Sequence, residues 1–410
     1  MAAVIKGSPK IAIIAASAPP YGAGGVASAH YNLWRALVQR GYPAKLFTFY
    51  DNGVPQEKSK SIVRHGAAPQ WVKRLFVLIN TPMRLLQPGK LVYHVAETLR
   101  NMPGSMRMAR SIQAFDPDAV VLSDHGAPGL WLRKKTGQRF VLISHHNPAR
   151  ISAESGLGDF SKLDTRLAIW LENRVLRKVD AVICPSHYMR GWFRKTYQFE
   201  GQVSVVPNLI DFSTVDAIKL RSVTSKLKLS AQTRAIYLPS AGSRIKGSEY
   251  LIGIIDGLLK NSPQLGFYIP GHIDADVLGS LKKHSAVNQM LLPGQVSYPQ
   301  HIGYVKSCDV AISPALMENF SMAIVEAAYL GLPVVAFRRG GNADIITDGK
   351  NGYLVSDLTT MVKKAALLFN SPKLAATKQA VKNYTRQKFD TDSILDDYLS
   401  VLLSSGGVRG

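Results

Sequence analysis

Cysteine is scarce in this sequence, and its scarcity limits the compartments and scaffolds that fit the chain. Only two cysteines, Cys184 and Cys308, occur among 410 residues, and each stands within an apolar run. A disulfide framework or a zinc cluster needs more thiols than these two supply. We therefore expect two buried free thiols in a protein of the reducing cytoplasm.

Long hydrophobic runs are also lacking, because no apolar stretch approaches the roughly 18 residues of a membrane-spanning helix. Near the amino terminus, Lys6 and Lys10 precede the short apolar stretch 11–18, which ends in a sequence similar to a signal-peptidase site. The stretch leads directly into a glycine-rich loop and a helical pattern. We therefore interpret it as a first parallel strand and not as a secretion signal.

Acidic side chains are the third shortage. The chain carries 50 Lys and Arg against 28 Asp and Glu, which gives a formal net charge of +22. Residues 1–210 hold 28 basic and 12 acidic side chains, whereas residues 211–410 hold 22 and 16. Such an excess attracts a nucleic acid, an anionic membrane surface or a phosphorylated substrate. No helix-turn-helix pattern or aromatic RNA-binding motif accompanies it, so we expect no nucleic acid partner.

What the chain does contain is a regular alternation of strand and helix patterns. Apolar runs typical of buried parallel strands recur in the first half at residues 10–18, 44–50, 119–123, 139–144 and 180–186. The rhythm restarts in the second half at residues 234–241, 266–271, 289–294, 309–315 and 332–337. This pattern is typical of the α/β class with mostly parallel sheets. We predict two doubly wound, Rossmann-like domains, 1–206 and 207–385, and a terminal segment, 386–410, within a helical tail that starts near Asn383.

Two acids of the second half, Glu318 and Glu326, lie eight positions apart. The chain has only eight Glu, and this spacing alone is weak evidence of function. Its setting is more informative, because a predicted strand delivers Glu318 to the carboxyl end of a sheet, where open α/β sheets bind ligands. Ser321 is positioned to cap a helix over residues 322–330, so Glu326 falls just over one turn into that helix.

The start of this predicted helix is a candidate anion site. Its free backbone amides suit a diphosphate, and the two carboxylates can accept hydrogen bonds from vicinal hydroxyl groups on either side. A nucleoside-diphosphate sugar has this layout of ribose, diphosphate and sugar. Arg244 and Lys246, at the junction of another predicted strand and helix, add two cations that suit a diphosphate leaving group.

The stretch 313–355 closely resembles the E-x7-E region of the retaining family-4 glycosyltransferases, which have the GT-B fold. The resemblance extends over nearly the whole chain. The other matching positions are Ser186 at the end of one strand, Asn208 and Asp211 in a PNGxD-like segment with Leu209 in place of glycine, and Asp344 in a GGxxEx…DGxNGxLV-like pattern. The resemblance implies two domains that face each other across a cleft, with the terminal helix packed on the first domain, which binds the acceptor.

The resemblance also implies roles for the matching residues of the second domain. Glu326 takes the place of the acid that binds the donor ribose, and Glu318 that of the acid near the donor sugar hydroxyls. Lys246 matches the family's phosphate-binding lysine more firmly than Arg244 matches its arginine. The loop whose backbone surrounds the donor sugar and phosphate corresponds to Asn319, Phe320, Ser321 and Met322, with Ser321 where relatives often have glycine.

A glycine loop, Gly22, Gly24 and Gly25, follows the first predicted strand. In the family this loop faces the cleft, where its amides approach the phosphate or the acceptor. A nicotinamide site is the alternative use of such a loop. The full GxGxxG spacing is missing, and Asp51 is the nearest candidate for a ribose acid, so we do not expect that cofactor.

Three histidines stand at the ends of two consecutive predicted strands. His125 matches the histidine that, in the family, lies near the donor sugar and the acceptor. His145 and His146 end the next strand, where relatives have one histidine in the cleft. The sequence leaves open which of these two faces the site.

Three DxD sequences, the metal–diphosphate signature of the other major glycosyltransferase fold, also occur: Asp116–Asp118, Asp274–Asp276 and Asp390–Asp392. Three matches in one chain show how common the pattern is. We interpret the first as the start of a strand and Asp392 as a helix cap. Since cations replace a metal in this interpretation, we predict metal-independent catalysis with no cofactor besides the nucleotide-sugar co-substrate.

Residues 71–110 form a basic segment with interspersed aromatic and aliphatic side chains. Seven Lys and Arg stand there against one acid. Such a segment can lie in an anionic membrane surface, as the first domain of several relatives does, or can pack its apolar face on its own sheet. The charge asymmetry between the domains favours the membrane, so we expect a cytoplasmic protein that is peripheral on the inner face of the cytoplasmic membrane.

These observations predict a retaining glycosyltransferase that moves a hexose from a UDP- or GDP-sugar to a hydroxyl of a glycan or lipid-linked acceptor. The resemblance places such an activity in bacterial surface polysaccharide or lipopolysaccharide assembly. One alternative is a sugar-nucleotide epimerase of the same fold, which would consume donor without any acceptor. The other is a basic nucleic-acid-binding protein, which the missing motifs disfavour.

Overall fold

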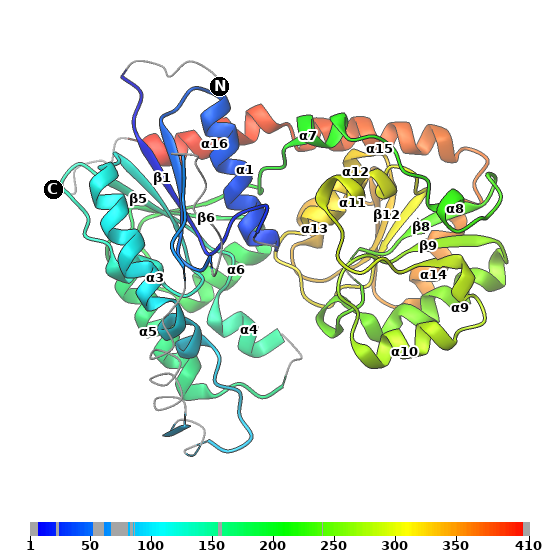
Figure 1. Ribbon diagram of the computed structural model, residues 1–410, viewed down its shortest axis with the longest axis horizontal. Helices are drawn as coiled ribbons and strands as arrows, with labels where there is room; N and C mark the ends of the chain where they lie inside the picture. The colour runs from blue at the N-terminus through cyan, green and yellow to red at the C-terminus, as the bar shows by residue number, and fades with distance from the viewer. Residues whose placement is uncertain are drawn as a thin grey trace. The chain divides into compact units, whose positions relative to one another are not determined.

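The computed structural model describes residues 7–21, 24–51, 61–66, 81–82, 85, 87–154, 158–239 and 241–404. Their contacts divide the chain into two compact units (Figure 1). The first consists of Met1–Ile210 together with Thr391–Gly410, and the second of Asp211–Asp390.

The first unit is built on a sheet of seven parallel strands in the order β3-β2-β1-β4-β5-β6-β7. Its strands are β1 (Ile11–Ala15), β2 (Ala44–Thr48), β3 (Ile62–Val63), β4 (Ala119–Ser123), β5 (Arg139–Ile143), β6 (Ala181–Cys184) and β7 (Gln202–Val205). The register pairs Ile11 with Ala44 on one side and with Ala119 on the other, which puts β1 in the interior of the sheet. All five residues of β1 are buried, as expected of a strand covered by helices on both faces.

Helices cover both faces of this sheet (Figure 1). On one face, α1 (Gly25–Gln39) packs on β1 and β2, and α16 (Thr391–Leu403) packs on β4 and β5. On the other, α3 (His94–Phe115), α5 (Lys162–Leu176) and α6 (His187–Thr196) contribute to one hydrophobic core with the strands. The continuous apolar runs of the sequence are therefore strands buried on two sides.

Helix α1 ends where the sequence predicts, at Gly41. This glycine has φ +87°, a left-handed conformation that lets the chain turn back on the helix. Gly41 N donates to Val38 O (3.1 Å) and Tyr42 N donates to Leu37 O (3.0 Å), which satisfies the last carbonyls of the helix. The sharp turn then leads into β2.

The predicted helical tail is interrupted. Helix α15 (Leu374–Lys388) belongs to the second unit and α16 to the first, with Phe389 and Asp390 between them. Phe389 is only 2% exposed and packs against Phe320. Arg139 Nε donates to Val401 O (2.8 Å) and ties α16 to β5.

The second unit is built on a six-stranded parallel sheet in the order β10-β9-β8-β11-β12-β13. Its strands are β8 (Arg234–Tyr237), β9 (Leu265–Tyr268), β10 (Met290–Leu291), β11 (Val310–Ser313), β12 (Val334–Phe337) and β13 (Gly352–Val355). Helices α9 (Leu251–Asn261) and α14 (Leu358–Phe369) pack against each other and α14 packs on β11, β12 and β13. Helix α12 (Met322–Tyr329) packs on β11, β12 and α15 (Figure 1).

The α/β fold class with two parallel Rossmann-like sheets is confirmed. Each predicted strand run overlaps an observed strand, and β3, β7 and β13 lie outside these runs. Strand β3 has two residues and lies at the edge of its sheet, so it carries no long apolar run. Strand β13 was recognised only as part of a motif, because two of its four residues are half-exposed.

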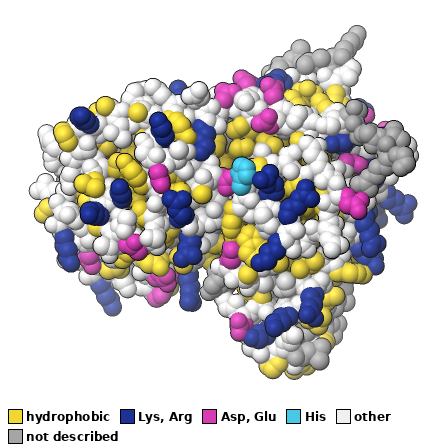
Figure 2. All heavy atoms as spheres, turned by 180° about the vertical axis from the view of Figure 1, so that it is seen from behind, with side chains coloured by type: hydrophobic (Ala, Val, Ile, Leu, Met, Phe, Trp, Pro, Cys, Tyr) yellow, Lys and Arg dark blue, Asp and Glu magenta, His cyan; other side chains and the backbone are white. Residues whose placement is uncertain are grey.

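Both cysteines are free, buried thiols, as predicted. No helix within the described part of the chain is long and apolar enough to cross a membrane. Lys and Arg side chains are spread over the face shown in Figure 2, among neutral and hydrophobic ones.

Candidate active site

The strand order of each sheet reverses at one internal point, between β1 and β4 in the first unit and between β8 and β11 in the second. At such a point the loops that leave the carboxyl ends of the two strands diverge, and a ligand can lie between them. In the second unit these loops carry Arg244 and Lys246 after β8 and Glu318 after β11.

The two loops are joined through the backbone. A short helical turn, η2 (Arg244–Lys246), presents Ile245 O to Leu316 N and Met317 N, at 3.1 and 3.3 Å. Gly247 follows with φ +86°, and a methyl group placed on it would lie 2.1 Å from Pro314 O. Only glycine allows this close approach, so the sequence Lys-Gly fixes the position of η2.

This contact brings Lys246 to Glu318. Lys246 Nζ donates to Glu318 Oε1, and the two side chains are 28% and 11% exposed. The backbone of Glu318 is held from the other side, because Glu318 O accepts from Gly341 N (2.9 Å). Gly340 has φ +54°, and a methyl group on it would lie 1.9 Å from Glu318 O. The predicted carboxylate and cation therefore form a partly buried ion pair at the switch point.

Arg244 lies on the same turn but is exposed. Its backbone N donates to Asp274 Oδ2 (3.1 Å), which ties the turn to the start of α10 (Ala275–Lys283). Its guanidinium makes no hydrogen bond or ion pair among the interactions of the described residues. Lys246 is thus positioned by a carboxylate, whereas Arg244 is positioned only through its backbone.

The start of α12 lies directly after the Glu318 loop. Ser321 is the residue before the helix, as predicted, but its side chain makes no capping hydrogen bond. The first bond of the helix runs from Val325 N to Ser321 O (3.2 Å), so three amides from Met322 onward have no partner within the helix. Phe320 is 6% exposed and packs on Phe389, with ring centres 6.0 Å apart. Ser321 therefore lacks the capping hydrogen bond that the sequence predicts, and the start of the helix is open to an anion.

Glu326 lies within α12 and is 8% exposed. Tyr298 Oη donates to Glu326 Oε1 (2.8 Å) from the first residue of α11 (Tyr298–Val305). Burial raises the pKa of Glu326 to about 7, and the hydrogen bond from Tyr298 opposes this rise. Sequence analysis missed Tyr298, since nothing in the spacing links residue 298 to residue 326.

A polar cluster lies at the end of β8 and β9. His301 Nε2 contacts Tyr237 Oη (3.2 Å) and His301 Nδ1 contacts Tyr268 Oη (3.1 Å). Burial lowers the pKa of His301 to about 4, so the ring is neutral and can accept from one hydroxyl while it donates to the other. Burial, together with the nearby charge of Glu326, raises the pKa of Tyr237, which keeps this hydroxyl uncharged.

In the first unit, the switch point brings together the glycine loop and the end of β4. Gly24 has φ +130° and precedes α1, whose first bond runs from Ser28 N to Gly24 O (3.1 Å). No atom lies within 4 Å of a methyl group placed on Gly24 or Gly25, so the loop borders open space. Gly22 lies outside the described residues.

His125 follows β4 and is 26% exposed. Its Nε2 lies 3.5 Å from Glu97 Oε2, and Arg100 pairs with the same carboxylate at 2.6 Å. Although burial favours the neutral acid, the hydrogen bond from His125 and the charge of Arg100 hold the pKa of Glu97 below its usual range. Glu97, on α3, was not identified from the sequence.

The two histidines after β5 have different surroundings. His145 is buried, and its Nε2 contacts Asn208 Oδ1 (2.9 Å) while its ring lies 5.4 Å from that of His30. His146 packs edge-on against His125, with ring centres 4.9 Å apart. Burial lowers the pKa of both imidazoles, so both are neutral. Of these two residues, His146 is therefore the one that contacts His125.

The connection between the units starts with the PNGxD-like segment. Leu209 is buried, and its backbone is not in the left-handed region, so this position does not require glycine. Asn32 Nδ2 donates to Leu209 O (2.9 Å) and holds the segment against α1. Asp211 caps α7 (Phe212–Ala217) by accepting from Thr214 N (3.2 Å).

The remaining acids singled out in the sequence have structural partners. Asp51 accepts from Arg64 Nη1 and from Thr48 Oγ1, both at 2.7 Å, in a buried cluster. Asp118 precedes β4 as predicted, whereas Asp392 does not cap α16 but lies in its first turn and pairs with Arg40. No group of three or more His, Cys, Asp or Glu within the described ranges is placed to hold a metal ion.

The basic segment 71–110 is only partly described. Residues 71–80, 83, 84 and 86 lie outside the described residues, and the amphipathic pattern expected there falls mainly on them. Most of the remainder forms helix α3, whose start is capped by Asp164 Oδ2, which accepts from His94 N (2.8 Å).

Two parallel Rossmann-like sheets, with an ion pair and an open helix start at the switch point of the second, define a GT-B type architecture. The chain belongs to the family-4 glycosyltransferases: residues 23–214 match the family described as Glycosyltransferase Family 4, and residues 225–388 match Glycosyl transferases group 1. It is therefore a retaining hexosyltransferase that uses a nucleotide-sugar donor.

Individual proteins show how far the similarity reaches. A D-inositol 3-phosphate glycosyltransferase of Nocardiopsis dassonvillei is 25% identical over 334 residues, which are 73% of this chain and 76% of that protein. Sucrose-phosphate synthase from Thermosynechococcus elongatus has a similar structure, with a TM-score of 0.75 at 17% identity over 97% of this chain and 100% of that one. HepE of Anabaena, in complex with UDP and glucose, has a TM-score of 0.68 at 18% identity, with the same coverage of both chains.

Proposed function

We propose that the protein transfers a hexose from a UDP- or GDP-sugar to a hydroxyl of a glycan or lipid-linked acceptor in bacterial surface polysaccharide or lipopolysaccharide assembly. A protein in the cps region of Klebsiella pneumoniae is 21% identical over 60% of the chain, which supports this setting. A lipopolysaccharide glycosyltransferase, WaaG, shares the fold with a TM-score of 0.68.

One observation carries the proposal. The Lys246–Glu318 ion pair stands immediately before an open helix start, and a second carboxylate, Glu326, lies within that same helix. The cation and the amides suit a diphosphate, while the two acids suit hydroxyl groups on either side of it. Asn319, Phe320, Ser321 and Met322 then form the loop around the donor.

In the proposed reaction the bond between C1 of the sugar and the diphosphate oxygen breaks while a bond from the acceptor oxygen to C1 forms on the same face. Lys246, Arg244 and the α12 amides stabilise the negative charge that develops on the leaving diphosphate. The proton of the acceptor hydroxyl passes to the leaving phosphate oxygen. Glu318 binds the donor sugar, Glu326 the ribose, and the first unit supplies His125, His146 and the Gly24–Gly25 loop.

We assign His145 a supporting role beside His146, through its contact with Asn208.

Lys246 and Arg244 take the place of a divalent metal in the proposed mechanism. Transfer in the presence of a chelator tests this proposal. Full activity after treatment with EDTA agrees with it, whereas a loss restored by Mg²⁺ contradicts it.

The decisive test of the activity is product analysis with UDP-glucose, UDP-N-acetylglucosamine and GDP-mannose, each with and without a mixture of glycan and lipid-linked acceptors. We expect one donor to be consumed in an acceptor-dependent manner, with the anomeric configuration retained. Conversion of a donor to an isomeric sugar nucleotide without acceptor would identify an epimerase instead. Binding of plain duplex in place of any sugar nucleotide would favour the nucleic-acid alternative.

A surface of the first unit supports the proposed position of the protein on the cytoplasmic face of an anionic membrane. On α5, Leu163, Leu167 and Trp170 are 37–50% exposed and recur at helical spacing on one face. The guanidinium of Arg174 lies 3.8 Å from the centre of the Trp170 ring. Exposed apolar side chains bordered by cations are typical of helices that lie in a membrane interface.

The described end of the basic segment lies beside the start of this helix. Leu91 N donates to Asp159 O and Ser161 N donates to Leu91 O, both at 2.8 Å. Leu85 and Leu91 are 75% and 41% exposed. Leu91 therefore lies beside the start of α5, where it adds an exposed apolar side chain.

Flotation with phosphatidylglycerol vesicles tests this surface. The wild-type protein should float with these vesicles and not with phosphatidylcholine, and Trp170→Glu should abolish flotation. Leu367→Glu, which alters an equally exposed leucine of the second unit, is the matched control and should float normally. Flotation that is unchanged by Trp170→Glu contradicts the assignment.

A further inference from the structure

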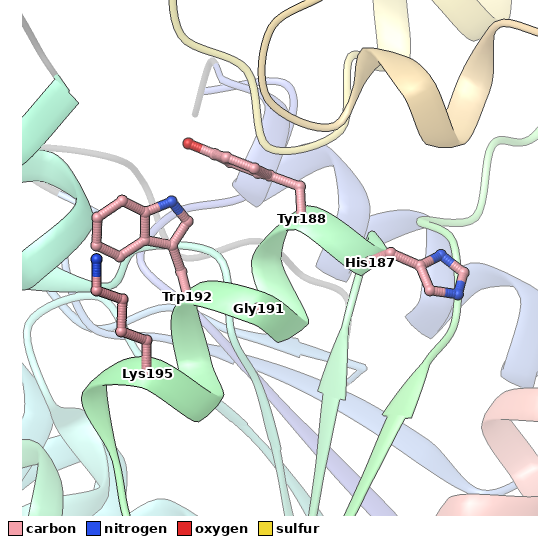
Figure 3. Close-up of a pocket in the computed structure, with 5 residues that line it drawn as sticks. All are labelled: His187, Tyr188, Gly191, Trp192 and Lys195. Carbon is pink, nitrogen blue, oxygen red and sulfur yellow. The ribbon is translucent and has the colours of Figure 1, made fainter.

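A hollow of about 300 Å³ on helix α6 of the first unit has no role in the reaction described above. It is lined by His187, Tyr188, Gly191, Trp192 and Lys195. Figure 3 shows the rings of Tyr188 and Trp192 on one side of the helix, with Lys195 on the following turn and His187 directed away. The hollow is therefore bordered by two aromatic rings and a cation.

The wall between the two rings is open. A methyl group placed on Gly191 would meet no atom of the described residues within 4 Å, so none of them covers this position. Lys195 Nζ lies 4.8 Å from the centre of the Trp192 ring, which keeps the ammonium group beside the aromatic surface. Helix α6 also carries Arg190 and Arg194 and no acidic residue.

A buried cation interacts with Tyr188 of this aromatic surface. Arg150, on α4 (Pro148–Glu154), is 1% exposed and is among the largest fully buried side chains. Its Nη2 donates to His146 O (3.2 Å), but neither Nε nor Nη1 makes a hydrogen bond to the described residues. No carboxylate of the described part of the chain forms an ion pair with it, although a buried guanidinium keeps its charge and normally requires one.

Two contacts connect Arg150 to the hollow. Asn147 Oδ1 accepts from Arg150 N (3.0 Å), and Asn147 Nδ2 donates to Trp192 O (3.4 Å), which fastens the start of α4 to α6. The Tyr188 hydroxyl donates to Glu154, at the end of α4. The hollow thus lies at the carboxyl ends of β5 and β6, on the same edge of the sheet as His146.

We propose that this hollow is an acceptor subsite and that it selects an acceptor sugar bearing an anionic group, either a phosphate or a carboxylate. The proposal deepens the glycosyltransferase function and depends on it. The apolar face of a pyranose ring packs on Trp192 and Tyr188, because aromatic faces bind the C–H groups of sugars. Lys195 contacts the anionic group directly, and the buried Arg150, whose charge acts on Tyr188, adds positive charge on the same side of the helix pair.

Calorimetric titration of the full chain tests the proposal, with UDP held at saturation so that the donor phosphate site is occupied. The ligands are a hexose 6-phosphate, the matching hexuronate and the neutral hexose. We expect the anionic sugars to bind at least about tenfold more tightly than the neutral one, with a preference that weakens as salt is added. The tighter of the two anionic ligands identifies the group that the subsite takes.

Variants of exposed or half-buried residues distinguish this site from a general effect of positive charge. Lys195→Glu should remove the preference for anionic sugars, and Trp192→Ala should weaken the binding of all three sugars. Arg133→Glu makes the same change in charge at an exposed position outside the hollow and should behave as the wild type. Equal affinities for charged and neutral sugars, no binding at millimolar concentration, or an unchanged preference in Lys195→Glu would each overturn the proposal.

The acceptor subsite and the glycosyltransferase reaction can be tested separately. UDP affinity and donor hydrolysis should be the same in Lys195→Glu and in the wild type, because the change is confined to the acceptor side. Failure of the wild-type protein to bind either UDP or GDP would count against the glycosyltransferase reaction, whereas the sugar titrations repeated without nucleotide would still report on the hollow.

Discussion

The two sheets have closely similar strand orders, but their carboxyl ends are equipped in opposite ways. In the second unit, Lys246 and Glu318 form an ion pair and Glu326 lies inside an adjoining helix. In the first unit, the corresponding edge carries His145 and His146, whose pKa values burial lowers, and so presents neutral rings. The residues that directly follow β5 are therefore neutral, and the charged groups near His125, Glu97 and Arg100, reach this edge from α3.

We propose that the difference follows from what each edge binds, the diphosphate of the donor at the second and the acceptor at the first. A diphosphate carries fixed negative charge, and a leaving group that gains charge needs donors already in place. The main-chain contacts at Gly247 and Gly340 supply this rigidity. An acceptor hydroxyl is neutral before it reacts, and neutral imidazoles can orient it.

The largest effect should come from removing the cation of the charged edge. Lys246→Ala leaves Glu318 without its partner and the leaving diphosphate without a donor, so we expect kcat to fall about 10²–10³-fold. Steady-state kinetics with the identified donor measures this. Lys283→Ala, at an exposed position on α10, is the control and should keep wild-type kinetics. Similar turnover in both variants would mean that the charged edge does not stabilise the leaving group.

The glycine loops of the two units should differ in how well they tolerate a side chain. Gly247→Ala forces a methyl group to 2.1 Å from Pro314 O at a positive φ, so the free energy of unfolding should fall by about 1–3 kcal/mol. In Gly25→Ala the new methyl group meets no atom within 4 Å, so the free energy of unfolding should change little. Urea unfolding of the two variants measures both. Equal losses would show that the first unit is as tightly constrained as the second.

The third prediction concerns the buried acid. With a pKa of about 7, Glu326 loses its charge as the pH falls, so donor affinity should drop about tenfold between roughly pH 8 and pH 6. Calorimetric titration of the donor measures this. Glu326→Gln should show weaker binding with little pH dependence, and Tyr298→Phe should move the wild-type profile to higher pH. A pH profile that persists in Glu326→Gln must come from another group.

The same acid affects stability in a definite direction. The folded pKa, about 7, lies above the ordinary value of 4.5, so the folded protein binds this proton more tightly than the unfolded chain. The resulting stabilisation is complete below that ordinary value and is lost as the pH rises through about 7. Glu326→Gln should therefore gain stability relative to the wild type as the pH rises, which thermal unfolding at several pH values can check.

The smallest effect should come from an exposed ion pair. Arg40 on α1 pairs with Asp392 and Asp396 on α16 at 2.8 and 2.6 Å, but its side chain is 32% exposed. Solvent screening limits such pairs, so Arg40→Ala should cost less than about 1 kcal/mol in urea unfolding. Lys282→Ala, on exposed α10, provides the baseline. A much larger loss would indicate that α16 depends on this pair for its attachment to the first unit.

Much of the fold could be predicted because strands covered on both faces produce long apolar runs. The local parts of the site could be predicted for a related reason. Glu318, Ser321 and Glu326 are neighbours along one strand–loop–helix unit, and their spacing is fixed by that geometry. Lys246 was identified because it follows a strand that belongs to the same sheet edge.

The residues that were missed are those that reach the site from distant segments. Tyr298 and Glu97 lie on helices α11 and α3, and their partners stand 28 positions away in each case. Arg150 was missed because burial, which makes it unusual, is a property of packing that the sequence pattern Asn-Pro-Ala-Arg does not show. The register of the two histidines depends in the same way on side-chain packing around His125.

The first unit is assembled from the beginning and the end of the chain, because α16 completes the packing of β4 and β5. During synthesis, the uninterrupted second unit can reach its final fold while the earlier-made half still waits for its last helix. A fragment that stops after Ile210 should accordingly expose an apolar strip along those two strands and should be prone to aggregation, whereas residues 211–390 alone contain every strand of their sheet.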